Sequence, residues 1–152
     1  MSEFARELNN ILVEAFHNIL RYEEETLKRN SRIPLTINEM HMIECIGNGD
    51  GGSKTISNVA QSLKITKPSV TVAVNKLVKK GYVNKTNCTK DGRVINVSLT
   101  REGEKIRRLH RRYHSNMVIQ LECEFSEEEK RNLLSAIERL NIFFKSNIGD
   151  DK

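Results

Sequence analysis

Small, polar and basic residues share one face of a stretch with helical spacing, and their chemistry suits contact with a nucleic acid. The candidates for contact with base edges are Lys67, Ser69, Thr71, Val72 and Asn75. An asparagine reads adenine with two hydrogen bonds in the major groove, and a valine or threonine methyl group packs against the methyl group of thymine. Lys76 and Lys79 suit phosphates, which position a protein on DNA without specifying a sequence. The alternative is a helix side that only faces solvent.

A second candidate group lies at residues 90–93, where an Asp-Gly pair is typical of a tight turn between strands. We expect Arg93 to enter the minor groove, whose negative potential favours a cation. Lys85 and Lys90 would contact phosphates, and Asp91 would pair with an arginine and shape the turn. The alternative is that Arg93 is an ordinary surface arginine.

Two short helices joined by a tight turn would position the first group. Thr55 and Thr66 are suitable N-caps for helices that begin after them, and residues 64–65 make the turn. Gly81 is expected to end the second helix. The predicted buried stripe of that helix is Val70, Val74, Leu77 and Val78. This is a helix-turn-helix, and the alternating or β-branched segments 82–86 and 94–99 would follow it as the strands of a wing.

Amphipathic helices are predicted on both sides of this unit. Apolar residues recur with a helical period from Glu3 to about Arg29. Thr36 and Glu39 form a capping box that begins a second helix, and its buried face includes Met40 and Ile43. Residues 47–53 contain four glycines, which predicts a flexible loop.

The C-terminal third is predicted to form two further helices. Thr100 caps one that runs to about Cys123, and Ser126 with Glu129 forms the capping box of the other. The last helix carries Leu133, Leu134, Ile137, Leu140, Ile142, Phe143 and Phe144. That is more apolar surface than one helix on a small domain buries alone, so we expect it to pack against a second subunit.

Charge is distributed unevenly along the chain. Residues 54–112 hold 15 lysines and arginines against 3 acidic residues, a balance of +12, whereas the remainder has a balance of −7. A basic centre between acidic flanks is typical of proteins that bind a polyanion, although a solvated surface gives the same pattern. Its coincidence with a helix-turn-helix favours DNA.

Composition points to a single domain with a modest core. The 152 residues are 38% hydrophobic and contain no tryptophan. There is no apolar run as long as a membrane span, and the N-terminus lacks the order of a signal peptide, so we expect a cytoplasmic protein without membrane partners. The three widely spaced cysteines include no CxxC pair, which excludes a zinc ribbon and fits reduced thiols.

Catalytic motifs are missing from the sequence. There is no phosphate-binding loop, nucleophile elbow or HExxH pair. The GNGDGG segment follows a predicted helix rather than a strand and lacks the GK[ST] ending of a nucleotide loop. We therefore expect neither an enzyme nor a bound cofactor.

Residues 63–71, 77–83 and 91–103 resemble the MarR family of bacterial winged-helix repressors. The most specific part is the Asp-x-Arg wing followed by a Leu-Thr-x-x-Gly helix start. The resemblance implies a mainly α protein with a small β wing, in a single chain over residues 1–152. Its DNA-binding lobe would be residues 35–99, and residues 1–34 and 100–148 would form a homodimerisation region. The helix over 66–80 would enter the major groove of a palindromic operator.

Residues 38–47 and 108–118 resemble the branch that represses fatty-acid biosynthesis genes in Gram-positive bacteria. That branch uses long-chain acyl-acyl carrier protein as corepressor. The chain departs from the branch in its longer glycine loop and in Lys67-Pro68. An acidic carrier protein would complement the charge of Arg108, Arg111 and Arg112, although the same patch could approach phosphates or form ion pairs within the protein or dimer.

In this family an effector pocket lies between the dimerisation helices and the DNA-binding lobe. The resemblance makes Phe16, Leu20, Met40, His41, Leu109 and Tyr113 the candidate lining residues, each of which is equally suited to a plain core.

Other signals stay open as alternatives. No metal site is expected from a motif, but His110 and His114 have a workable i, i+4 spacing for zinc, and His41 or glutamates could join them in the fold. Cys88 would suit a thiol switch. A small phenolic or lipophilic effector, or a nucleoid protein that binds DNA without specificity, would also account for the pattern.

Overall fold

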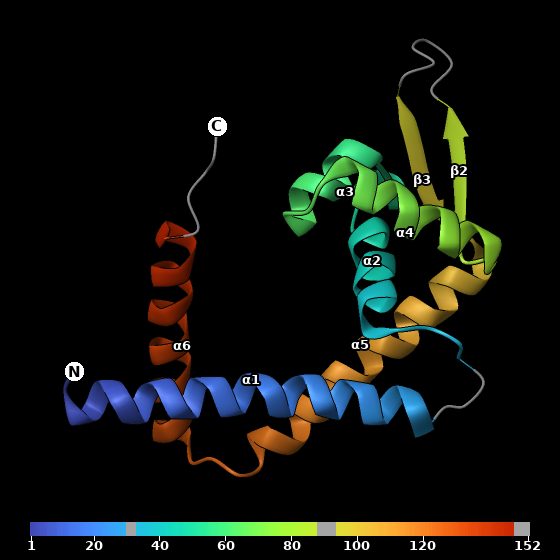
Figure 1. Cartoon of the computed structure of the whole chain (residues 1–152). Helices are drawn as coiled ribbons and strands as arrows, with labels where there is room; N and C mark the ends of the chain where they lie inside the picture. Colours follow the sequence, from blue (N-terminus) through green and yellow to red (C-terminus); the bar gives the residue numbers. More distant parts are fainter. Residues whose placement is uncertain (30–32, 88–93, 148–152) are drawn as a thin grey trace. The chain divides into compact units, whose positions relative to one another are not determined.

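The computed structural model describes residues 1–29, 33–87 and 94–147, and within them it is mainly helical with one small sheet (Figure 1). In chain order the elements are α1 (Glu3–Arg29), α2 (Ile37–Gly47), the 3-10 turn η1 (Asp50–Gly52), β1 (Ser53–Thr55), α3 (Ile56–Leu63), α4 (Lys67–Lys79), β2 (Val83–Asn87), β3 (Ile95–Leu99), α5 (Arg101–Glu122) and α6 (Glu127–Asn147). The chain divides into two compact units, Met1–Arg111 and Arg112–Lys152. The predicted fold class is confirmed.

The predicted helix starts are confirmed by their caps. Thr36 Oγ1 accepts a hydrogen bond from the amide of Glu39, and the Glu39 carboxylate accepts one from the amide of Thr36 at 2.9 Å. Thr55 and Thr66 each accept from the amide three residues later, at 3.1 and 3.3 Å. Such caps satisfy amides that have no partner inside the helix.

The sheet contains one more strand than the sequence predicted. Its order is β1-β3-β2, and both pairings are antiparallel, with Ser53 opposite Ser98 and Val83 opposite Leu99. The prediction of a flexible loop over 47–53 is therefore wrong at both ends, because Gly47 is the buried last residue of α2 and Ser53 begins β1. Gly51 and Gly52 have φ of +61° and +75°, so the glycines do supply the turn that leads into this strand.

The core of the first unit joins α2, α3, α4 and the sheet. Met40, Ile43, Ile46, Val59, Val70, Val74, Leu77 and Val97 are at most 1% exposed. Burying each such side chain contributes about 1.5–3 kcal/mol relative to leaving it in water. Val78 is 38% exposed, so its predicted burial is wrong. It lies about 80° around the helix from Val70, at the edge of the stripe rather than in it.

The start of α5 is fixed against the base of the wing. The amide of Thr100 donates to the carbonyl of Tyr82 at 3.0 Å, and Thr100 Oγ1 donates to the carbonyl of Gly81 at 2.7 Å. A Cβ atom on Gly103 would collide with the Tyr82 carbonyl oxygen. The Leu-Thr-x-x-Gly pattern thus encodes a close approach of α5 to the first residues of the wing.

The long helices α1, α5 and α6 all expose large apolar side chains. Every residue of α6 is at least partly exposed, and Leu134, Ile142 and Phe143 are each more than half exposed. On α1, Phe4 and Phe16 are 72% and 61% exposed. None of the helices in the described ranges is long and apolar enough to cross a membrane.

Candidate nucleic-acid interface

Helix α4 presents its polar and basic side to solvent because its other side is held in the core. Val70, Val74 and Leu77 are completely buried. The residues left exposed on the opposite side are Lys67, Ser69, Val72, Asn75, Lys76 and Lys79, and Thr71 is half-buried. These are the seven predicted contact residues on this helix, and all of them are at least partly accessible to solvent.

The chemistry of this face differs between its members. Val72 is 57% exposed, so its methyl groups are accessible for an apolar contact such as one with a thymine methyl. Thr71 Oγ1 donates to the carbonyl of Lys67 at 2.9 Å, and Ser69 Oγ lies 2.8 Å from Thr66 Oγ1. The Thr71 proton is therefore already used inside the helix, which leaves the Thr71 methyl as the more suitable group for contact with a base.

Asn75 is tied to the wing. Lys85 Nζ, on β2, donates to Asn75 Oδ1 at 3.1 Å. This contact orients the carboxamide of Asn75 and places a positive charge beside it. The sequence predicted a phosphate contact for Lys85, and the structure adds a second role that links strand β2 to helix α4.

The other predicted contact residues belong to the chain segment between β2 and β3. Lys90, Asp91 and Arg93 lie outside the described residues, as does Cys88. Strands β2 and β3 that lead to the tip are paired from Val83 opposite Leu99 to Asn87 opposite Ile95.

The C-terminal end of α4 is anchored to α2. Lys80 Nζ donates to both carboxylate oxygens of Glu39, at 2.7 and 2.8 Å, and to the carbonyl of Pro34 at 2.8 Å. Burial alone would raise the pKa of Glu39, but the hydrogen bonds from Lys80 and Thr36 outweigh it, so the pKa lies below its ordinary value. Sequence reasoning missed this pair, since the two residues are 41 positions apart.

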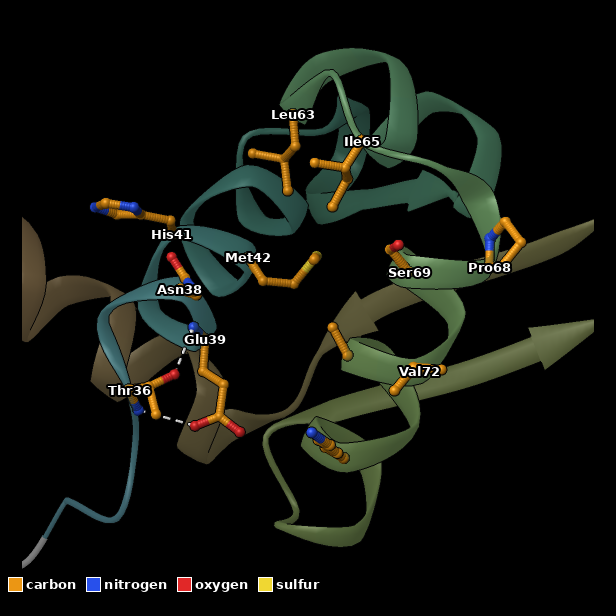
Figure 2. Close-up of a pocket in the computed structure, with 12 residues that line it drawn as sticks. Thr36, Asn38, Glu39, His41, Met42, Leu63, Ile65, Pro68, Ser69 and Val72 are labelled. Atoms are coloured by element: carbon orange, nitrogen blue, oxygen red, sulfur yellow. Dashed lines mark hydrogen bonds between the residues drawn. The ribbon is translucent and has the colours of Figure 1, made fainter.

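A pocket of about 840 Å³ lies between α2 and α4 (Figure 2). Its lining includes Met42 and Leu63 together with Ser69, Val72 and Lys76 of the exposed α4 face. A molecule bound in this pocket would therefore touch residues that are also candidates for DNA contact.

Among the predicted effector-lining residues, His41 lines this pocket. Met40 is 1% exposed and packs in the core, while Phe16 is 61% exposed. Leu20, Leu109 and Tyr113 are half-buried.

The arginines of α5 differ in their surroundings. Arg111 Nε lies 2.8 Å from Glu44 Oε1, and its Nη2 donates to Asn48 Oδ1 at 2.6 Å. Arg107 also donates to Asn48 and contacts Glu104. For Arg111, ion pairing within the chain is thus the arrangement observed. Arg108 and Arg112 are exposed.

The structure also brings together residues far apart in sequence. His110 is 7% exposed, and it lies beside His41 of α2 and Glu23 of α1. Sequence reasoning paired His110 with His114 and left His41 or glutamates open as further ligands. The cluster in the structure instead joins His110 to His41 and Glu23, and Glu23 was not singled out because packing alone brings it there.

Comparison with known proteins assigns this arrangement to a family. The model of the MarR family matches residues 35–95. FabT of Streptococcus pneumoniae, solved in complex with DNA, is 33% identical, with 93% of this chain and 98% of FabT covered and a TM-score of 0.87. The transcriptional regulator PchR of Bacillus subtilis (strain 168) is 27% identical over 122 residues, which span 78% of this chain and 71% of PchR. MepR of S. aureus, solved in a complex with DNA, is 19% identical, and the match covers 87% of this chain and 94% of MepR with a TM-score of 0.73. At this identity the likeness concerns the fold alone.

Proposed function

Because this chain belongs to the MarR family of DNA-binding transcriptional regulators, we propose that it is a repressor that binds a palindromic operator as a homodimer. The observation that carries the proposal is the exposed basic face of α4, which the fully buried Val70, Val74 and Leu77 fix in orientation. The similarity to FabT in complex with DNA, over 93% of this chain, supports the same conclusion. A regulator of this kind works in the cytoplasm, where it meets chromosomal DNA.

Each part of the interface has a proposed role. Helix α4 enters the major groove, where Asn75 reads an adenine and Val72 meets a thymine methyl. Lys76 and Lys79 bind phosphates and set the register of the helix on the duplex. Arg93, at the tip of the wing, enters the minor groove.

The homodimer follows from the apolar surface of the terminal helices. Leu134, Ile142 and Phe143 on α6 are each more than half exposed, as are Phe4 and Phe16 on α1, and large apolar surfaces exposed in this way mark protein–protein contacts. A second copy of the chain would bury them and place two copies of α4 on one face of the duplex, one helical turn apart.

We further propose that the regulated genes belong to fatty-acid biosynthesis and that long-chain acyl-acyl carrier protein is the corepressor. This rests on the resemblance of residues 38–47 and 108–118 to that branch and on the similarity to FabT. Arg108 and Arg112 remain the candidates for docking the acidic carrier protein, since both are exposed.

A gel-shift titration tests both levels of the proposal. The probe is the promoter region upstream of the protein's own gene, at fixed salt and with an excess of unrelated competitor DNA. We expect a shift that survives the competitor and that long-chain acyl-acyl carrier protein strengthens, whereas the unacylated carrier protein has no effect.

The proposal has two parts, the sequence-specific repressor and the fatty-acid assignment, and one result would contradict each part. Equal affinity for the promoter and the competitor would indicate a nucleoid protein that binds without specificity. Specific binding that no acyl carrier protein alters would remove the fatty-acid assignment and leave the repressor.

A further inference from the structure

Three potential metal ligands from three helices converge within the unit Met1–Arg111. One ligand atom each from Glu23 of α1, His41 of α2 and His110 of α5 lies within 4.8 Å of the other two. His41 Nε2 is 3.5 Å from a carboxylate oxygen of Glu23. The ring centroids of His41 and His110 are 5.8 Å apart.

The burial of these three groups is uneven in a way that suits a cation. The Glu23 side chain is 10% exposed and His110 is 7% exposed, whereas the His41 side chain is 44% exposed. A carboxylate that is largely removed from water is stabilised by a positive charge beside it. His41 is the member of the cluster that is most exposed to solvent.

The donor set matches zinc. Two imidazole nitrogens and one carboxylate oxygen are the ligands of His₂Glu zinc sites, in which water or another group takes the fourth position. Ligand atoms around a tetrahedral zinc ion are about 3.3 Å apart, so the atoms here need to move by about 1 Å or less to reach that spacing. Rotation of the side chains is enough for such a shift. Magnesium is disfavoured because it prefers oxygen ligands in an octahedron.

We propose that Glu23, His41 and His110 bind one zinc ion per chain. The ion joins α1, α2 and α5 at a point remote in sequence from the DNA-contact residues. This goes beyond the proposed repressor function, since zinc binding is measured on the protein alone and its failure would leave the DNA-binding proposal untouched.

The test is a zinc titration of the full-length protein after removal of metal with a chelator, with a competing fluorescent indicator to report affinity. We expect one tight zinc ion per chain, and cobalt substituted for zinc is expected to give the visible absorption of a tetrahedral complex. Glu23→Gln and His41→Ala each remove one ligand and are expected to weaken zinc binding at least about 100-fold, since even indirect partners of metal ligands cost 10–100-fold.

Matched variants separate a ligand role from a loss of folding. His17→Ala is the control, since His17 is an exposed histidine on α1 beside Phe16. The zinc affinity of the His17→Ala variant is expected to equal that of the wild type. His41 is half-exposed, so His41→Ala is expected to keep the circular dichroism and the melting temperature of the metal-free protein. Zinc binding below one ion per chain, or unchanged affinity in both Glu23→Gln and His41→Ala, would overturn the proposal.

Discussion

Asn75 and Lys76 are neighbours on α4, and we propose different roles for them in DNA binding. The Asn75 carboxamide accepts a hydrogen bond from Lys85, and its Nδ2 group is the donor that we propose for contact with a base. Lys76 is an exposed cation, which suits contact with a phosphate. The two roles are separable, because contacts with bases carry sequence information and contacts with phosphates carry salt dependence.

Asn75→Ala is therefore expected to cost about 1–3 kcal/mol of operator binding and to relax the preference at one base pair. Lys76→Ala is expected to weaken binding to all sequences alike and to lower the slope of log affinity against log salt by about 1. Fluorescence anisotropy with a set of single-base operator variants at several salt concentrations measures both. If Asn75→Ala left the preference at every operator position unchanged, Asn75 would not be a base-reading residue.

Glu39 gives the fold an acid-sensitive contact. Its folded-state pKa is lowered, so ionised Glu39 contributes stability above the ordinary carboxyl pKa, and this contribution is lost as the pH falls through the lower folded value. Glu39→Gln keeps the shape but loses the ion pair with Lys80. We expect the variant to lose about 1 kcal/mol of unfolding free energy at pH 7 and to lose less stability than the wild type on acidification.

Urea denaturation of both proteins at pH 7 and at a pH below 4 measures this difference. Glu102→Gln is the control, since Glu102 forms an exposed pair with Lys105 on the surface of α5. If the unfolding free energies of Glu39→Gln and the wild type fell by the same amount on acidification, the stabilising role of ionised Glu39 would be contradicted.

At the scale of elements, the sequence predicts the pieces with strong local signals. The caps at Thr36, Thr55 and Thr66 are short-range hydrogen bonds, so the residues alone reveal them. Strand β1 has only three residues and owes its existence to pairing with β3, more than 40 positions away, which no local period reveals. The same limit applies to Glu23, since its proximity to His41 and His110 is a product of packing.

The contact between α5 and the base of the wing is sensitive to a single substitution. Gly103→Ala would force its Cβ into the carbonyl oxygen of Tyr82, which already accepts a hydrogen bond from the amide of Thr100. Because backbone rather than a flexible side chain is in the way, we expect a loss of about 1–3 kcal/mol of stability. Thermal denaturation followed by circular dichroism measures the loss, and Ser115→Ala on the exposed side of α5 is expected to melt like the wild type. An unchanged melting temperature for Gly103→Ala would show that the helix start shifts freely.

At the scale of the whole molecule, the proposed repressor depends on assembly. Ile142 on α6 is 67% exposed, and a charge at this position is tolerated by the single chain but not by an apolar interface. Ile142→Glu is therefore expected to convert a dimer of about twice the 17.5 kDa chain mass into a monomer with an unchanged helical content. Light scattering after size exclusion measures the mass, and Lys145→Ala serves as a control on the same helix. A dimeric Ile142→Glu variant would place the interface elsewhere.

The zinc ion and the DNA are expected to favour the same conformation. The three ligand atoms converge in a chain that has a TM-score of 0.87 to FabT in its complex with DNA. Helix α2, which carries His41, packs against both α3 and α4, so an ion that fixes α2 to α1 and α5 restrains the DNA-reading helix. A ligand shifts an equilibrium only by its preference for one state, and coupling between two sites is reciprocal.

We expect zinc to tighten operator binding by about 5-fold or more in the wild type and in His17→Ala, with no effect in His41→Ala. Anisotropy titrations with zinc and with chelator measure this, and the operator is expected to raise zinc affinity by the same factor. Equal operator affinity with and without zinc in the wild type would show that the metal site does not regulate DNA binding.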